Sequence, residues 1–247
     1  MNDSLYHDPD LTRFYDRENG WREDFDYCVG MARGALSILD LGCGTGQLAA
    51  VLSNDGARRV VCVDPADPML DIARSRPGGD CVTWVCADTR TVRLEQSFDL
   101  IVMTGHAFQV FLTPDDRLAV LRTVAAHLAP EGRFVFDTRN PVYREWEEWT
   151  PERSQRVLQD AELGKIVIWD DVALDAATGV VTYETHYEPE TTGRRYSARA
   201  RIAFPERVEV EQLVGAAGLR IDRILGDWTG SPWQDDAREI IVVGGLS

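Results

Sequence analysis

The amino-acid sequence predicts a doubly wound α/β fold, in which helices cover both faces of a largely parallel sheet. Strand-sized apolar runs alternate with helical patterns between residues 37 and 137, a glycine-rich turn follows the first run, and the alternation resumes after residue 205. In such folds ligands bind at the carboxyl ends of the strands. The residues that follow each predicted strand are therefore the candidate site.

Size and charge restrict the class of protein. A chain of 247 residues is long enough for one large α/β domain or two small ones. The net charge of -15 argues against a nucleic-acid partner, because binding phosphates requires an excess of Lys and Arg. The longest apolar runs, such as Leu100–Met103 and Ile240–Val243, are too short to cross a bilayer, and Met1–Asp10 lacks a signal-peptide pattern. We therefore expect a cytoplasmic protein without a membrane segment.

The five cysteines do not form a recognisable metal or disulfide pattern. Their number is odd and no C-x-x-C spacing occurs. Cys62, Cys81 and Cys86 lie in or beside apolar runs, which predicts small buried hydrophobic side chains. The sequence predicts neither a disulfide framework nor a metal site.

Apolar runs between residues 37 and 137 predict the strands of the parallel sheet. They span Ser37–Leu41, Arg59–Val63, Val82–Val85, Leu100–Met103 and Arg133–Asp137. Gly42 follows the first run and Asp64 closes the second, so both lie at the edge of the sheet where a ligand is expected.

Helical spacing of the apolar residues between these runs predicts the covering helices. The first covers about residues 46–54. Asp67 is the expected N-cap of the next, with Pro68 at its first position. Thr113 caps the clearest helix, which runs to Leu128. Residues 1–36 are polar and aromatic, and they form either helices at the domain edge or a cover over a ligand.

The alternation breaks between residues 138 and 205. Three segments there alternate as strands, Ile166–Leu174, Val180–Tyr187 and Arg195–Phe204, which predicts an inserted antiparallel sheet. A helix over Arg207–Ala217 then precedes strands at 219–226 and 239–243, and their short connection requires an antiparallel hairpin. The predicted organisation is a lead-in at 1–36, a main domain at 37–137 and 206–247, and an insertion at 138–205.

The turn after the first strand reads Asp40-Leu41-Gly42-Cys43-Gly44-Thr45-Gly46. Glycines in a strand-to-helix turn let a ligand approach the backbone closely. A dinucleotide-binding fingerprint would require glycine at Gln47, and a phosphate-binding loop would require a lysine that is absent here. The turn therefore suits a ligand without a pyrophosphate, which favours S-adenosylmethionine over NAD.

This turn resembles the first motif of the class I S-adenosylmethionine-dependent methyltransferases. Further segments resemble the family's later motifs in the same order; they are Asp64-Pro65 with Met69, Ala87-Asp88-Thr89, Phe98–His106 and Leu128–Phe136. The resemblance implies a seven-stranded sheet of order 3-2-1-4-5-7-6 with the last strand antiparallel. Within the family the whole chain looks closest to bacterial small-molecule methyltransferases, whose insertions form a β-rich cap over the acceptor pocket.

The resemblance also implies roles for particular residues. The methionine end of S-adenosylmethionine, or of the product S-adenosylhomocysteine, would contact Asp40, Gly42, Cys43, Gly44 and Gly46. The ribose would contact Asp64, Pro65 and Met69, because one carboxylate can accept hydrogen bonds from two adjacent hydroxyls. The adenine would contact Ala87, Asp88 and Thr89, and the transferred methyl would face Thr104 and Gly105. His106 is the candidate general base, and the alternative is that it only lines the cofactor pocket.

The predicted function is methyl transfer by in-line displacement to an oxygen or nitrogen nucleophile of a small molecule. Such a reaction needs alignment and exclusion of water more than a large catalytic apparatus. The sequence leaves open a non-catalytic protein that binds S-adenosylmethionine or S-adenosylhomocysteine, and an NAD-dependent oxidoreductase. Nucleic-acid amine methyltransferases are disfavoured, because Met103–His106 replaces their Asn/Asp-Pro-Pro-Tyr/Phe motif. The oligomeric state is also open, with a homodimer as one alternative.

Overall fold

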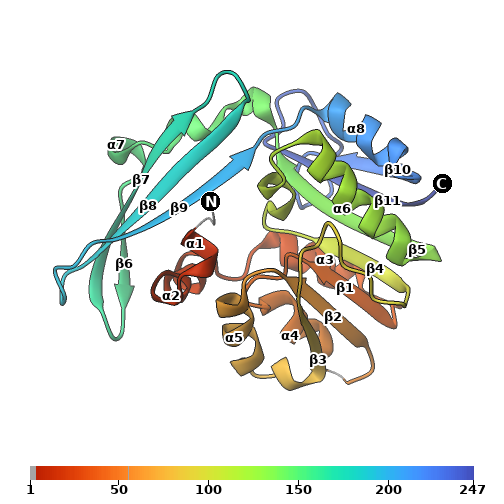
Figure 1. The fold of residues 1–247 in the computed structure, drawn as a ribbon, viewed down its shortest axis with the longest axis horizontal. Coiled ribbons are helices and arrows are strands. Elements are labelled where there is room, and N and C mark those ends of the chain that lie inside the picture. The colour runs from red at the N-terminus through yellow and green to blue at the C-terminus, as the bar shows by residue number, and fades with distance from the viewer. Residues whose placement is uncertain (1–3, 55) are drawn as a thin grey trace.

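The computed structural model describes residues 4–54 and 56–247, so Asp3, one of the acids in the N-terminal segment, lies outside the described residues. The molecule contains two sheets that lie on either side of the N-terminal helices (Figure 1). No helix within the described ranges combines the length and apolarity needed to cross a membrane.

The larger sheet has seven strands in the order β10-β11-β5-β4-β1-β2-β3. Its strands are β1 (Ser37–Leu41), β2 (Arg59–Asp64), β3 (Val82–Cys86), β4 (Phe98–Met103), β5 (Leu128–Arg139), β10 (Leu219–Leu225) and β11 (Glu239–Leu246). The first five are parallel, and β11 is antiparallel to both β5 and β10. The predicted order, the antiparallel last strand and the terminal hairpin are therefore confirmed.

Helices cover both faces of this sheet. They are α3 (Glu23–Met31), α4 (Gln47–Ser53), α5 (Asp67–Ser75), α6 (Pro114–His127) and α8 (Arg207–Ala216). Neighbouring residues of β1 point to opposite faces, so that Leu39 packs in the cluster with α6 and α8, and Ile38 packs in the cluster with α3 and α4. This two-sided burial explains why the strands are continuous apolar runs.

The structure corrects two local predictions. The helix α5 begins at Asp67 and its N-cap is Ala66, because the Asp64 carboxylate accepts a hydrogen bond from the Ala66 N–H and ends β2 just before it. Cys81 and Cys86 are exposed instead of buried, because β3 is the edge strand of the sheet. All five cysteines are free thiols.

The smaller sheet is antiparallel and has four strands in the order β6-β7-β8-β9. They are β6 (Arg156–Asp160), β7 (Gly164–Leu174), β8 (Val180–Pro189) and β9 (Tyr196–Ala203). The sequence predicted the last three strands and missed β6, which is a short and mostly exposed edge strand without apolar alternation. The strands fall inside the predicted insertion, and the domain division itself stays a prediction.

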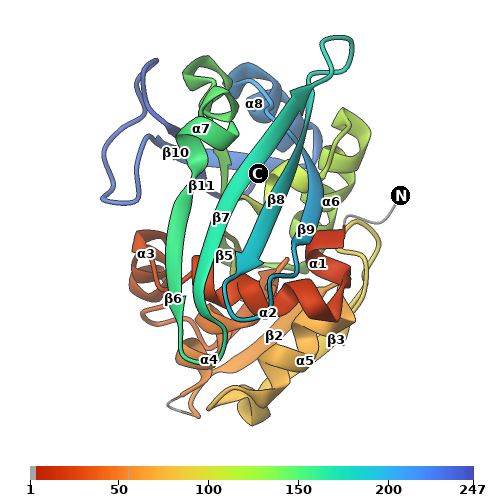
Figure 2. The same cartoon turned by 90° about the vertical axis from the view of Figure 1, so that its left-hand side faces the viewer.

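The N-terminal helices α1 (Ser4–His7) and α2 (Pro9–Glu18) pack against the smaller sheet (Figure 2). Leu11 and Phe14 from α2 join Ile166, Ile168 and Tyr187 in a separate apolar core. Short helical segments complete the described chain; they are η1 (Gly79–Cys81), η2 (Ala107–Val110), η3 (Pro141–Tyr143), η4 (Glu145–Glu148) and α7 (Pro151–Ser154).

Candidate active site

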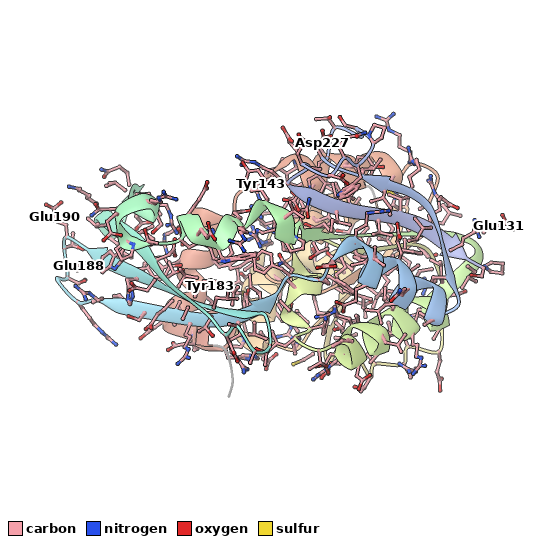
Figure 3. The ribbon with its side chains drawn as sticks, turned by 90° about the horizontal axis from the view of Figure 1, so that it is seen from above. Glu131, Tyr143, Tyr183, Glu188, Glu190 and Asp227 are labelled. Atoms are coloured by element: carbon pink, nitrogen blue, oxygen red, sulfur yellow. The ribbon has the colours of Figure 1, made fainter. Side chains whose placement is uncertain are left out.

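A cavity of about 820 Å³ lies at the carboxyl edge of the larger sheet. Its floor comes from the segments that follow β1, β2 and β4, and its other wall includes side chains of α1, α2 and β8. Tyr183 of β8, which lines the cavity, lies between the tip of the smaller sheet, marked by Glu188 and Glu190, and Glu131 at the opposite end of the molecule (Figure 3). The volume is that of a typical small-molecule site.

Most of the residues that the sequence predicted for the site line this cavity. They are Gly42, Gly44, Asp64, Pro65, Met69, Asp88, Thr89, Thr104, Gly105 and His106. Asp40 and Cys43 instead line a smaller adjoining cavity beneath the glycine turn, together with Arg22. Gly46 and Ala87 line neither of the two cavities. The individual ligand contacts of all these residues remain predictions.

The glycine turn is bound to the end of β2 through Asp64. One carboxylate oxygen accepts the Gly44 N–H at 2.9 Å and the other accepts the Ala66 N–H at 2.8 Å. Burial raises the pKa of Asp64 above its ordinary value, and the two backbone donors oppose this shift. The turn is thus built so that a carboxyl group is held at a fixed place on the cavity floor.

The glycines of the turn have left-handed backbones but different surroundings. At Gly44 (φ +53°) a Cβ would come no closer than 3.8 Å, to Tyr15, so the turn opens toward the cavity there. At Gly46 (φ +72°) a Cβ would lie 2.4 Å from the Trp84 ring. Gly46 therefore permits the turn and the packing of β3 against it. Gly46 itself does not line the cavity.

Asp40 is buried beneath this turn, with 3% of its surface exposed. Burial, reinforced by the neighbouring Asp64, raises the pKa of Asp40 to about 7. A carboxyl group that is so poorly solvated gains from an approaching cation. This position is consistent with the predicted contact to the amino group of a ligand's methionine moiety.

Asp88 is held by Arg90, whose guanidinium Nε and Nη2 donate to the carboxylate at 3.0 and 2.6 Å. These hydrogen bonds keep the pKa of Asp88 below its ordinary value. Arg90 also donates to Asp116 at 2.5 Å, which joins the segment after β3 to the start of α6. Asp88 is therefore a fixed, ionised acceptor at this end of the cavity.

His106 lines the cavity and has a left-handed backbone (φ +61°). Its backbone N–H faces both oxygens of Asp137 at 3.2 Å, and its Nε2 lies 3.0 Å from both oxygens of Glu239. Burial lowers the pKa of His106 to about 4, with a further contribution from Arg139, whereas Asp137 opposes the shift. The imidazole is therefore neutral at pH 7.

Asp137 and Glu239 were not predicted as site residues. The register of β5 and β11 brings them to one edge, because Asp137 nears the end of β5 and Glu239 begins the antiparallel β11. A signal existed in both cases, since each is an acid at the boundary of a predicted apolar strand. The ligand atoms of the three side chains lie within 4.8 Å of one another, a spacing that also suits a metal ion.

The wall opposite the glycine turn carries a polar network that the sequence did not reveal. The Tyr187 hydroxyl donates to Glu18 at 2.6 Å, Arg156 donates to Glu18 and to Asp170 at 2.8 Å, and Thr185 donates to Asp170 at 2.6 Å. All five side chains line the cavity. They come from α2, β6, β7 and β8, so only the tertiary structure assembles them.

Comparison with known proteins gives the same family along the central part of the chain. Residues 38–132 match the family model described as a methyltransferase domain. The cypemycin N-terminal methyltransferase of a Streptomyces species is 28% identical over 213 residues, which cover 84% of this chain and 82% of that protein.

Solved structures share the fold over the whole chain. The CcbJ methyltransferase from Streptomyces caelestis has a TM-score of 0.80 at 19% identity, with both chains covered completely. The sugar N-methyltransferase KedS8 from a Streptoalloteichus species has a TM-score of 0.74 at 20% identity, covering 100% of this chain and 95% of that one. Their fold includes the part of this chain that forms the smaller sheet.

Proposed function

The chain is a class I S-adenosylmethionine-dependent methyltransferase, and we propose that it methylates an amine nitrogen of a small molecule held between its two sheets. The observation that carries the proposal is the continuity of one cavity, which His106 also lines, from the glycine turn to the aromatic and charged wall of α2 and β8. A cofactor and an acceptor can therefore occupy adjoining parts of the same space.

The residues on the cavity floor fit S-adenosylmethionine. We assign the ribose to Asp64, whose buried carboxyl group faces the cavity, and the adenine to the segment of Asp88 and Thr89. The open face of Gly44 admits the methionine moiety, and Asp40 lies below it for the amino group. When bound, the cofactor supplies an electrophilic methyl group on a sulfonium whose charge disappears as the methyl leaves.

An amine acceptor is favoured over a hydroxyl by two features. The relatives that cover most of this chain include an N-terminal methyltransferase and a sugar N-methyltransferase, judged by their names. An amine also arrives as an ammonium ion at neutral pH, and the cavity offers a neutral imidazole to take its proton and carboxylates such as Glu18 and Asp170 to attract its charge. Alignment and exclusion of water supply the remaining catalysis.

The test is a comparison of matched amines and alcohols. The protein is incubated with methyl-labelled S-adenosylmethionine and with pairs that differ only in NH₂ or OH, including amino sugars and their parent sugars and peptides with free or hydroxy-terminated ends. Label should appear on nitrogen of the amine members only. Asp64→Asn should abolish product formation and weaken binding of S-adenosylhomocysteine in calorimetry. Label on oxygen, or binding without any transfer, would contradict the proposal.

A further inference from the structure

Two carboxyl groups, one buried and one partly buried, hold different parts of His106. Asp137 lies on β5 with 1% of its side chain exposed, and its two oxygens face the His106 backbone N–H. Glu239 lies at the start of β11 and both of its oxygens are 3.0 Å from Nε2, whereas Asp137 is 3.4 Å from the same nitrogen. Asp137 therefore restrains the backbone of this left-handed residue, and Glu239 restrains the ring.

We propose that Glu239 is a positioning residue, which accepts the Nε2–H of His106 and so leaves Nδ1 as the proton acceptor for the substrate amine. The inference rests on the proposed amine acceptor, and it adds a residue that lies outside the sequence motifs. A neutral imidazole carries its proton on one nitrogen and a lone pair on the other, and the hydrogen bond of one nitrogen decides which form is present.

The alternative tautomer would not work as a base toward the cavity. If Nε2 carried the lone pair, it would lie against the two carboxylate oxygens of Glu239, which repel it when the carboxylate is ionised. With Nε2–H donating to Glu239, that hydrogen bond is charge-assisted. His106 lines the cavity, and in this tautomer its Nδ1 carries the lone pair.

The proton transfer balances without any further reactant. The substrate ammonium gives one proton to Nδ1, and the resulting imidazolium keeps its Nε2–H on the Glu239 carboxylate. The freed nitrogen lone pair forms the new N–CH₃ bond as the S–CH₃ bond of the cofactor breaks, which leaves a thioether. The proton on His106 is then released to solvent, so that the base is regenerated.

Burial and Arg139 disfavour the imidazolium that forms during this step, whereas Asp137 and Glu145 favour it. The groups that face His106 and Glu239 from the surrounding elements are Arg22, Asp24, Asp137, Arg139 and Glu145. With Glu239, four carboxyl groups stand against two guanidinium groups. Burial raises the pKa of Glu239 to about 7, with Arg139 opposing the shift, so its ionised form is complete only on the alkaline side of neutrality.

The test reads the tautomer directly. Protein labelled with ¹⁵N-histidine is studied at pH 8 by long-range ¹H–¹⁵N spectra, with His106→Asn used to assign the signal. The expected result is Nε2–H with an unprotonated Nδ1 in the native chain. In Glu239→Gln the signal should change toward a mixture of tautomers, because a carboxamide can donate as well as accept. An Nδ1–H tautomer in the native protein would overturn the proposal, whether or not an acceptor is known.

Kinetics provide the second readout. Glu239→Gln should lower kcat with the amine acceptor by at least about tenfold, while the affinity for S-adenosylhomocysteine stays within twofold and shows that the variant is folded. Glu239→Asp should restore part of kcat, because it keeps the charge at a longer reach. An unchanged kcat in Glu239→Gln, or a kcat that requires added Zn²⁺ and is lost with EDTA, would overturn the proposal.

The smaller sheet offers a matched control. His186 on β8 also directs Nε2 to a carboxylate, that of Asp171 at 2.9 Å, but neither residue lines the cavity. Asp171→Asn makes the same chemical change and should alter only the His186 signal, with kcat unchanged. If the amine proves not to be methylated at all, the proposed function fails, whereas the tautomer of His106 is still decided by the spectra.

Discussion

Gly46 and Gly44 are two residues apart in the same turn, yet different forces select glycine at each. At Gly46 a side chain would overlap the Trp84 ring, and at Gly44 it would project into the open space of the cavity. Both have left-handed backbones, which cost a residue with a Cβ about 1–2 kcal/mol. A glycine motif read from sequence therefore combines a position that packing restricts with one that lines the cavity.

Substitution of Gly46 should mainly reduce stability. Gly46→Ala adds a methyl group 2.4 Å from Trp84 to a left-handed backbone, and we expect it to lower the free energy of unfolding by about 2–5 kcal/mol. Urea unfolding followed by circular dichroism measures the loss. The control is Gly30→Ala near the end of α3, where a Cβ meets nothing within 4 Å; it should be neutral or stabilising by up to about 1 kcal/mol. Equal effects at the two sites would contradict the packing explanation.

The main apolar contact of helix α2 is with the smaller sheet, not with the larger one. Phe14 is fully buried and stacks on Tyr187 of β8, with ring centroids 4.4 Å apart. Their cluster is separate from the two clusters that cover the larger sheet. The position of α2, which lines one side of the cavity, therefore depends on the smaller sheet.

Removal of the Phe14 ring should release α2 while leaving the larger sheet intact. Phe14→Ala should cost about 3–5 kcal/mol locally, seen as faster hydrogen exchange over Pro9–Glu18 and a raised KM for the acceptor. Tyr187→Phe keeps the ring and loses only the hydrogen bond to Glu18, so its effect on exchange should be smaller. Exchange that increases equally in β1 and β4 would show that the two cores are not independent.

At the scale of the whole molecule, acidic groups are concentrated and several are buried. The net charge is -15, and burial raises the pKa of Asp40 to about 7, of Asp137 to about 6 and of Glu239 to about 7. In the unfolded chain such groups titrate near 4. Between about pH 4 and 7 the folded protein therefore binds more protons at these sites than the unfolded chain, and their contribution to stability is lost as the pH rises.

The protein without cofactor should accordingly be less stable at pH 7.5 than at pH 5.5. The lowered pKa of His106 has the opposite effect on stability, but it is one group against the three carboxyl groups. We therefore expect the free energy of unfolding to fall by a few kcal/mol, which is on the order of 5 °C in Tm. Urea unfolding at a series of pH values measures the slope. Asp40→Asn should make it shallower because it removes one of the three groups. Stability that increases from pH 5.5 to 7.5 would refute this assignment of charges.

The sequence by itself determined the strands of the parallel sheet, the site of the glycine turn and most of the cavity floor, and the family resemblance supplied the order of the strands. These features depend on local patterns: β1 and β2 are apolar runs buried on both faces, and Gly42, Gly44 and Asp64 follow strands whose carboxyl ends must meet. The start of α5 was displaced by one residue because Asp64 binds the Ala66 N–H, a contact that no propensity scale contains.

Only the tertiary structure decided what lines the cavity beyond the glycine turn. Glu239 meets His106 through a strand pairing across 133 residues of chain, and Glu18 meets Tyr187 across 169. Neither pair leaves a periodic signal, because each partner is a single polar residue whose neighbours in sequence belong to another element. The motif specifies the floor of the cavity by local pattern. The opposite wall is assembled from long-range contacts, and these depend on how the whole chain packs.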